Sequence, residues 1–451
     1  MAKRVYRNSL CVKKHKRYNG LDWISQLAED ILVFILSLLT MKEATRTSIL
    51  SRRWLKVWTL IPVLNFDAQQ TLNDVQLETK TLETERTSYV NWVNQVLSSC
   101  KGTPKMHKFR IRFDLDKSFG CDIDRWVTFA IEKKAEIIEL DLRDYFDTIF
   151  KKKYTFPFKY YQKQLRSRNI GFPGCSCLTS LQLANVNVTG EVVEYFLSNC
   201  LLLECLYIAA SDLLVNLKVD GPSLRLKYLD IKYCFSIKNV EISAVNLISF
   251  KYFGPKISMP LKCAPRLAEM LIGGSYSHYL IHNYYELSHY LYQLETLSLD
   301  VCYSKVTKDL QFPVLTNLRR LELITNTNDE ESLLGFTFLI EASPFLHKFT
   351  LKFHWYASYI QREAEEPKRC PHQHLKEVEF IGFVGEIIDV ELAMYIIENA
   401  VRLERFVFDT RKPHMIGSPW EFEETKEKRL ARRRAQRLLS KLHPNFDFVV
   451  V

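Results

Sequence analysis

The sequence predicts an α/β chain in which a short helical module is followed by a curved solenoid of parallel strands. Three observations lead to this prediction. The 451 residues exceed the roughly 100–200 of an ordinary single domain. An apolar stripe at helical spacing occupies residues 27–39. A short apolar pattern then recurs at near-regular intervals from residue 137 almost to the end of the chain, as in repeat proteins.

The bulk composition is that of a folded protein without a membrane anchor. Hydrophobic residues make up 47% and charged residues 25% of the chain, which is typical of globular domains. No apolar run reaches the ~18–20 residues that span a bilayer, and the basic N-terminus has no apolar segment behind it, unlike a signal peptide. The 11 cysteines lack framework spacing. We therefore expect reduced thiols and a nuclear or cytoplasmic location.

The positive charge is concentrated at the two ends of the chain. The formal net charge is +10, and residues 1–20 hold seven basic residues and no acid. Residues 426–441 hold eight basic residues and one acid, Glu427. The stretch between these ends is therefore net acidic, so we expect no nucleic-acid-binding surface on the body. Three interpretations of the basic ends stay open: a nuclear localisation signal, a contact with phosphate groups, or, more simply, a charged face in solvent.

Residues 21–67 predict three short helices. The first carries apolar residues at helical spacing, namely Leu27, Ile31, Ile35 and Leu38. Thr40 and Glu43 form a capping box for the second helix, Ser51 can cap the third, and Pro62 ends it. Helices this short cannot bury so much Leu, Ile and Trp alone. The stripe must pack on the rest of the chain or on a partner protein, and periodicity leaves both open.

The same segment resembles an F-box, in the form found in plants. The resemblance is carried along its whole length by Ile24-Ser25, Leu27, Glu29-Asp30, Ile31-Leu32, Ile35-Leu36-Ser37, Leu39, Glu43-Ala44, Thr47-Ser48, Leu50-Ser51 and Arg53-Trp54. Ala28 stands where the family has a proline that pre-sets the first helical turn. The resemblance implies docking of a Skp-type adaptor and, through it, a cullin. Carried over by position, the implied adaptor contacts are Leu27, Ile31, Leu32, Ile35, Leu36, Leu50 and Trp54.

The body of the chain carries ten copies of one short pattern. Each copy has an apolar residue, two others, an apolar residue, one other and a third apolar residue. The copies occupy residues 137–142, 178–183, 203–208, 226–231, 247–252, 294–299, 318–323, 346–351, 375–380 and 403–408. Most steps between them are 20 to 29 residues, and a weaker copy starts at Leu267. This spacing is that of leucine-rich repeats.

The repeats predict a solenoid over residues 68–366, with strands on its concave side and helices and loops on its convex side. A polar linker or exposed loop is expected at 68–88, followed by a helix at 89–97 and a strand at 109–113. Residues between the buried positions of each strand face the concave side. We expect a protein target to contact this side, at Tyr207, Asp230, Arg320, Glu322, Lys348 and Glu377.

Residues 367–451 resemble the FBD region of plant F-box/leucine-rich-repeat proteins. The resemblance rests on Cys370-Pro371-His372, His374-Leu375-Lys376, Gly382, Gly385, Tyr395 and Glu398-Asn399-Ala400. A basic amphipathic helix over 426–442 and a terminal apolar strand over 446–451 also match that family. The likeness covers most of the chain from about residue 20.

No catalytic, cofactor or metal motif is evident in the sequence. There is no phosphate-binding glycine loop and no dinucleotide fingerprint. Cys370, His372 and His374 lack a second ligand pair at zinc spacing. The resemblance implies a non-catalytic substrate-recognition subunit of an SCF-type cullin–RING ubiquitin ligase, which acts by raising the local concentration of its target.

Two alternatives stay open from the sequence. One is a ligand-dependent receptor of the same architecture, with a small molecule in a hollow of the solenoid. Six tyrosines between 276 and 292 are compatible with such a site or with buried loop rings. The other is a nuclear scaffold that acts through its basic ends.

Overall fold

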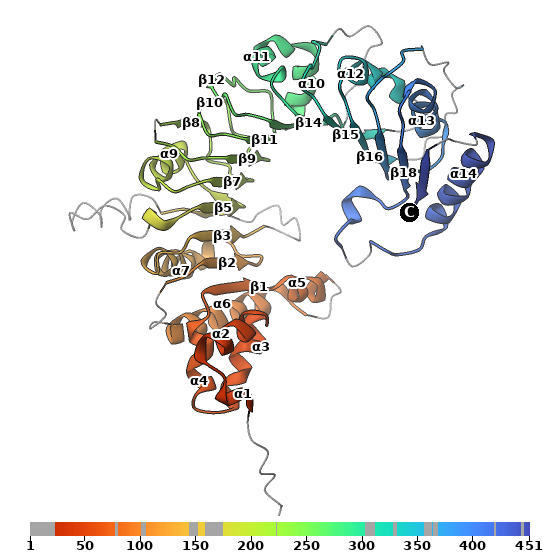
Figure 1. The fold of residues 1–451 in the computed structure, drawn as a ribbon. Coiled ribbons are helices and arrows are strands. Elements are labelled where there is room, and N and C mark those ends of the chain that lie inside the picture. The colour runs from red at the N-terminus through yellow and green to blue at the C-terminus, as the bar shows by residue number, and fades with distance from the viewer. Residues whose placement is uncertain are drawn as a thin grey trace, which may run out of the picture.

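The structure is a computed structural model in which one long parallel sheet runs through the chain as an arc (Figure 1). It describes residues 23–76, 80–100, 105–143, 152–157, 175–221, 223–302, 312–327, 332–355, 363, 369–418, 421–442 and 446–451. The 14 strands pair in chain order. They are β1 (Val63–Asp67), β2 (Lys108–Arg112), β3 (Ile137–Asp141), β5 (Ser180–Ala184), β7 (Cys205–Ala209), β9 (Tyr228–Lys232), β11 (Ser249–Phe253), β13 (Glu269–Gly273), β14 (Thr296–Asp300), β15 (Arg320–Thr327), β16 (Lys348–Trp355), β17 (Glu377–Ile381), β18 (Arg405–Asp409) and β19 (Asp447–Val450).

The predicted repeats are confirmed strand by strand. Each of the ten copies coincides with one strand, and the weaker copy at Leu267 leads into β13. The register stacks equivalent residues on neighbouring strands, as with Leu181, Leu206 and Leu229, and these side chains are almost completely buried. No single repeat could enclose its apolar side, so stacking of neighbours supplies the core.

Helices cover part of the convex side, but its middle is a second sheet. The helices of the described body are α5 (Gln69–Gln76), α6 (Leu82–Ser99), α7 (Gly120–Glu132), α9 (Gly190–Asn199), α10 (Ser275–His282), α11 (Ser288–Leu291), α12 (Thr337–Glu341), α13 (Ile387–Asn399) and α14 (Lys426–Leu442), and of these α7, α9, α10 and α11 lie on the outer side of the arc (Figure 1). The strands β8 (Asn216–Asp220), β10 (Asn239–Ser243) and β12 (Leu261–Cys263) form the parallel sheet, on the outer side of the arc (Figure 1). The prediction of helices and loops there was incomplete, because residues 216–220 and 239–243 alternate with period two, which favours strands. A two-stranded pair, β4 (Tyr154–Thr155) and β6 (Val186–Asn187), completes the sheets.

The N-terminal module comprises α1 (Trp23–Gln26), α2 (Glu29–Ser37), α3 (Met41–Arg46) and α4 (Trp54–Val57). The predicted capping box is present: the Glu43 N–H donates to Thr40 Oγ1 at 3.3 Å and the Thr40 N–H donates to Glu43 Oε2 at 3.0 Å. The core of this module is continuous with that of the solenoid. The predicted basic tail at 1–20 lies outside the described residues.

Two predicted boundaries need correction at this end. Strand β1 lies within the segment assigned to the helical module, yet it pairs with β2 and opens the long sheet. The stretch 68–88 is largely helical where it is described, not a linker. Leu72 and Val75 of α5 are buried, and the Tyr89 hydroxyl of α6 donates to the Phe66 carbonyl at 2.6 Å. Many polar residues there are compatible with a helix that buries a single face.

The C-terminal region continues the same sheet, as the copies of the pattern at 375–380 and 403–408 predict. β17 pairs with β16, β18 with β17, and β19 with β18. The predicted helix α14 and strand β19 are both present. Asp389 of α13 is fully buried, and its Oδ2 accepts the N–H groups of Val384 at 2.7 Å and Gly385 at 2.9 Å. This carboxyl fixes the turn after β17.

Asp389 gives the stability of the protein a specific pH dependence. Burial raises the pKa of its carboxyl to about 7, above the ~3.9 of an unfolded chain. Between these values the folded state holds a proton that the unfolded state has lost, so stability falls as pH rises and levels off above the folded pKa. Denaturant titrations should show that the free energy of unfolding of wild type falls, relative to that of Asp389→Asn, by about 1.4 kcal/mol per pH unit between about pH 5 and 7. A difference that stays constant with pH would contradict this expectation.

Candidate adaptor-binding surface and concave face

The N-terminal module exposes a concentration of large apolar side chains. Within 47 to 57, Ile49 is 87%, Leu50 63% and Leu55 55% exposed. The other exposed members are Ile24, Ile31, Phe34, Leu38 and Leu39. They lie on α1, α2, the turns that follow α2 and α3, and α4, and these short elements contact one another. We call these eight residues the apolar surface. Such a concentration is typical of a protein-interaction site.

The seven sequence-predicted adaptor contacts divide into two groups. Ile31 and Leu50 are exposed, and Leu27 and Ile35 are partly buried. Leu32, Leu36 and Trp54 are 0%, 1% and 5% exposed, which corrects their assignment as partner contacts. Leu32 and Leu36 are one helical turn apart, on the face of α2 that is turned into the core. Their role is to hold the module together.

Sequence reasoning missed six members of the apolar surface, which are exposed without having been assigned as contacts: Ile24, Phe34, Leu38, Leu39, Ile49 and Leu55. The signal was available in the composition of α2, whose nine residues EDILVFILS are apolar on more than one face. A short helix packed on one side cannot bury all of them. The surplus apolar residues are the ones left for a partner.

Polar contacts stabilise the helices that carry the apolar surface. Arg53 Nη2 donates to the Leu27 carbonyl at 2.6 Å. This hydrogen bond links the start of α4 to the start of α2. Ala28 has a φ of −59°, close to the −65° that proline imposes. The backbone at this position thus keeps the geometry that the family's proline would set, although Ala28 replaces it.

The six predicted target contacts lie in two rows across the long sheet. Tyr207 and Asp230 are register partners on β7 and β9, and Glu322 occupies the equivalent position of β15. Arg320, Lys348 and Glu377 are register partners on β15, β16 and β17. The strands line the inner side of the arc (Figure 1). The structure thus brings these residues onto one face, and their contact with a target stays a prediction.

Most charges of this face are compensated by neighbours. Lys352 lies 2.9 Å from Glu322, and Lys348 lies 3.2 Å from Glu379. Asp230 Oδ2 lies 3.0 Å from Lys232 Nζ, while its buried Oδ1 has no hydrogen-bond partner among the described residues. Burial raises the pKa of Asp230 and of Tyr207. The charges in the middle of the concave face are therefore largely neutralised within the sheet.

His372 of the C-terminal region has a structural role. The ring of His372 is buried: its Nε2 lies 2.8 Å from the Ser343 carbonyl, and its Nδ1 accepts the Leu375 N–H at 3.0 Å. Both ring nitrogens are thus occupied, and burial lowers its pKa. Among the described residues, no group of three or more His, Cys, Asp or Glu could hold a metal ion. In that part of the chain, no helix is long and apolar enough to cross a membrane.

The tyrosine-rich segment is mostly packed. The Tyr290 hydroxyl donates to the Leu261 carbonyl at 3.0 Å, Tyr276 is buried, and Lys256 Nζ lies 3.7 Å from the ring centre of Tyr279. These rings secure α10 and α11 to the convex side. They favour the interpretation of buried loop rings over a ligand site at this position.

The fold defines the class of protein: a leucine-rich-repeat solenoid with a short helical module at its N-terminal end. A family model described as "At1g61320/AtMIF1, LRR domain" matches residues 99–435. The F-box/FBD/LRR-repeat protein At3g26920 of Arabidopsis thaliana is 29% identical over 86% of this chain and 89% of the relative. The putative FBD-associated F-box protein At1g55030 of the same plant is 24% identical over 86% of this chain and 91% of the relative.

A shorter match is the F-box protein At5g03100 of Arabidopsis thaliana, 31% identical over 47% of this chain and 64% of the relative. The chain belongs to the plant F-box/leucine-rich-repeat proteins with an FBD region. These relatives indicate no catalytic family.

Proposed function

We propose that this chain is the substrate-recognition subunit of an SCF-type cullin–RING ubiquitin ligase. The observation that carries the proposal is the apolar surface, which lies within the segment that resembles an F-box. In this role the apolar surface contacts a Skp-type adaptor, and the adaptor connects the chain to a cullin. The complex acts in the nucleus or the cytoplasm.

In the proposed function, the concave face binds the protein target. Its two rows carry aromatic, acidic and basic side chains, and the charges are largely paired within the sheet. Paired charges of mixed sign suit a protein target better than a polyanion, because a nucleic acid requires a surplus of positive charge. The chain itself performs no chemistry; it raises the concentration of the target near the ubiquitin-charged enzyme.

Reconstitution with purified partners tests this function. The 451-residue chain is mixed with a plant Skp-type adaptor and the N-terminal part of a cullin, and the mixture is analysed by size-exclusion chromatography with light scattering. A stoichiometric ternary complex is expected. Elution of the chain apart from the adaptor at about 10 μM of each protein, well above the Kd of a specific interface, would refute the proposal.

A further inference from the structure

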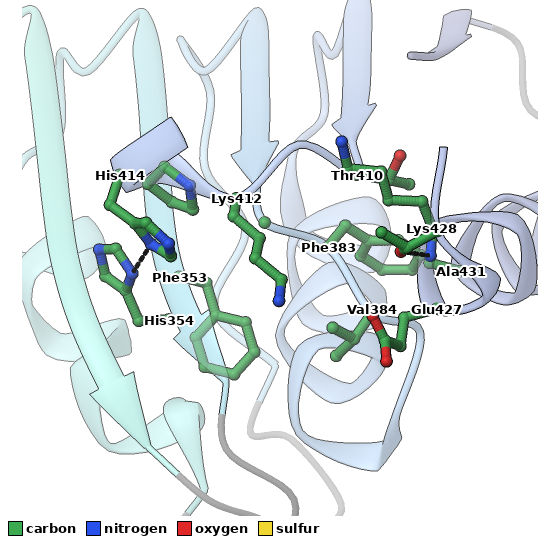
Figure 2. A pocket seen from close by; sticks show the side chains of 13 residues that line it. Phe353, His354, Phe383, Val384, Thr410, Lys412, His414, Glu427, Lys428 and Ala431 are labelled. Carbon is green, nitrogen blue, oxygen red and sulfur yellow. Dashed lines mark hydrogen bonds between the residues drawn. The ribbon is translucent and has the colours of Figure 1, made fainter. Parts of the chain in front are cut away.

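A pocket of about 430 Å³ lies at the C-terminal end of the solenoid, far along the chain from the apolar surface. Its walls come from four separate segments: the end of β16, the turn after β17, the segment after β18, and the start of α14 (Figure 2). Its volume falls within the ~300–1,000 Å³ of small-molecule sites.

The walls of this pocket are apolar and firmly held. Phe353 and Phe383 are 2% and 1% exposed, and Val384, Pro413 and Ala431 add further apolar surface. The turn that carries Phe383 and Val384 is fixed by Asp389. These contacts shape the hollow before any ligand arrives, which lowers the entropic cost of binding.

One side of the pocket carries polar groups that favour an anion. Lys412 is exposed, forms no ion pair with a described residue, and directs its ammonium group into the hollow beside Phe353 (Figure 2). The Nδ1 atoms of His354 and His414 lie 3.5 Å apart, with the rings stacked at 21°. Glu427 is the one carboxylate among the lining residues.

A buried lysine adds to the positive character of the pocket. Lys428 is 5% exposed, and its Nζ donates to the carbonyls of Glu421 at 3.0 Å and Glu423 at 2.7 Å. Carbonyl dipoles stabilise this charge, and no carboxylate of a described residue forms an ion pair with it. Two lysines, two histidines and one glutamate therefore line a largely apolar cavity.

We propose that this pocket binds a small molecule with an apolar ring or chain and a single carboxylate group. The apolar body lies against Phe353, Phe383 and Val384, and the carboxylate meets Lys412 and the histidine pair. Charge-assisted hydrogen bonds of this kind fix the orientation of a ligand in an apolar site.

The histidine pair makes the binding pH-dependent. Burial and the neighbouring His414 lower the pKa of His354, while Asp300 on β14 opposes this. Lys412 and Glu427 are the other charged groups beside the pair. A bound carboxylate adds a negative charge, which favours protonation of an imidazole, so binding takes up a proton. Affinity for a carboxylate should therefore rise as pH falls from about 8 to 6, whereas a neutral amide should show no such trend.

Matched acid and amide probes test the proposal on the 451-residue chain. The pairs are 2-naphthoate with 2-naphthamide, for a ring, and octanoate with octanamide, for a chain, each measured by isothermal titration calorimetry. At least one carboxylate should bind saturably and about tenfold more tightly than its amide, a difference that corresponds to one charged hydrogen bond. Equal affinity of acid and amide in both pairs, or no saturation by about 1 mM of either acid, overturns the proposal.

Point variants locate the binding in this pocket. Lys412→Met and His414→Gln should each weaken carboxylate binding about tenfold, and Ala431→Phe should abolish it by filling the cavity. Lys426→Met removes an exposed lysine of α14 that does not line the pocket, so it should leave affinity unchanged. An unchanged affinity in Lys412→Met places binding elsewhere and overturns the proposal. Adaptor binding should be the same in all four variants, so this test and that of the proposed function fail independently.

Discussion

The double variant Ile49→Asp/Leu50→Asp is expected to lose at least about a hundredfold in affinity for a Skp-type adaptor. Both side chains are among the most exposed apolar residues of the described chain, at 87% and 63%. Burying a large aliphatic side chain contributes about 1.5–3 kcal/mol, and an aspartate in its place would have to be desolvated without a partner. Biolayer interferometry with immobilised adaptor measures the loss.

Two further variants separate binding from folding. Leu201→Asp changes a residue that is 56% exposed after α9, away from the apolar surface, and should bind the adaptor like wild type. Leu27→Ala/Ile31→Asp should also lose binding, with a smaller effect because Leu27 is partly buried. Far-ultraviolet circular dichroism should show unchanged melting for the double aspartate variant. If the double aspartate variant bound the adaptor within about threefold of wild type, the apolar surface would not be the adaptor-binding site.

The second large expected effect is a loss of folding stability when Gly382, the residue after β17, is substituted. Gly382 has a φ of +90°, and a Cβ at this position would lie 2.1 Å from the Phe353 carbonyl oxygen. Since the clashing atom belongs to the backbone of β16, it can move only if the strands separate. Gly382→Ala should therefore lower the free energy of unfolding by roughly 3–5 kcal/mol, in the range of strongly destabilising single changes.

Gly417→Ala is the matched control for this prediction. Gly417 has a φ of +81°, but nothing lies within 4 Å of the position its Cβ would take. This variant suffers the strain of a left-handed backbone alone, about 1–2 kcal/mol. Denaturant titration of both variants should show the larger loss at Gly382. Equal losses would mean that backbone strain, and not the close approach of β16, decides the effect.

The strands were predictable because each repeat contains its own signal. In the copy at 226–231, Leu229 and Ile231 are two residues apart and both buried, and the same relation holds in every other copy. Identical spacing in successive copies also predicts which residues become register partners. Lys348 and Glu377 belong to copies 29 residues apart in the sequence, yet they are neighbours in the sheet.

The remaining features depend on contacts that no local pattern encodes. Leu32 and Ile31 are adjacent and both aliphatic, but only the packing of α4 against α2 decides that Leu32 is buried and Ile31 is not. His354 and His414 are 60 residues apart, and neither has a motif around it. The pocket exists because the segment after β18 and the helix α14 fold back to the end of β16. Such an arrangement becomes visible only in three dimensions.

The unbroken sheet also fixes the distance between the two ends of the solenoid. Neighbouring strands are spaced by about 4.8 Å, so the 14 strands from β1 to β19 set a contour of roughly 60 Å between the helical module and the far edge. Because every strand is hydrogen-bonded to the next, this length cannot be adjusted by a hinge within the sheet. Removing a repeat would shorten the contour by one strand spacing and turn everything beyond it. A molecule held near β17 is therefore presented to whatever docks at the helical end at a height and angle that the number of repeats determines.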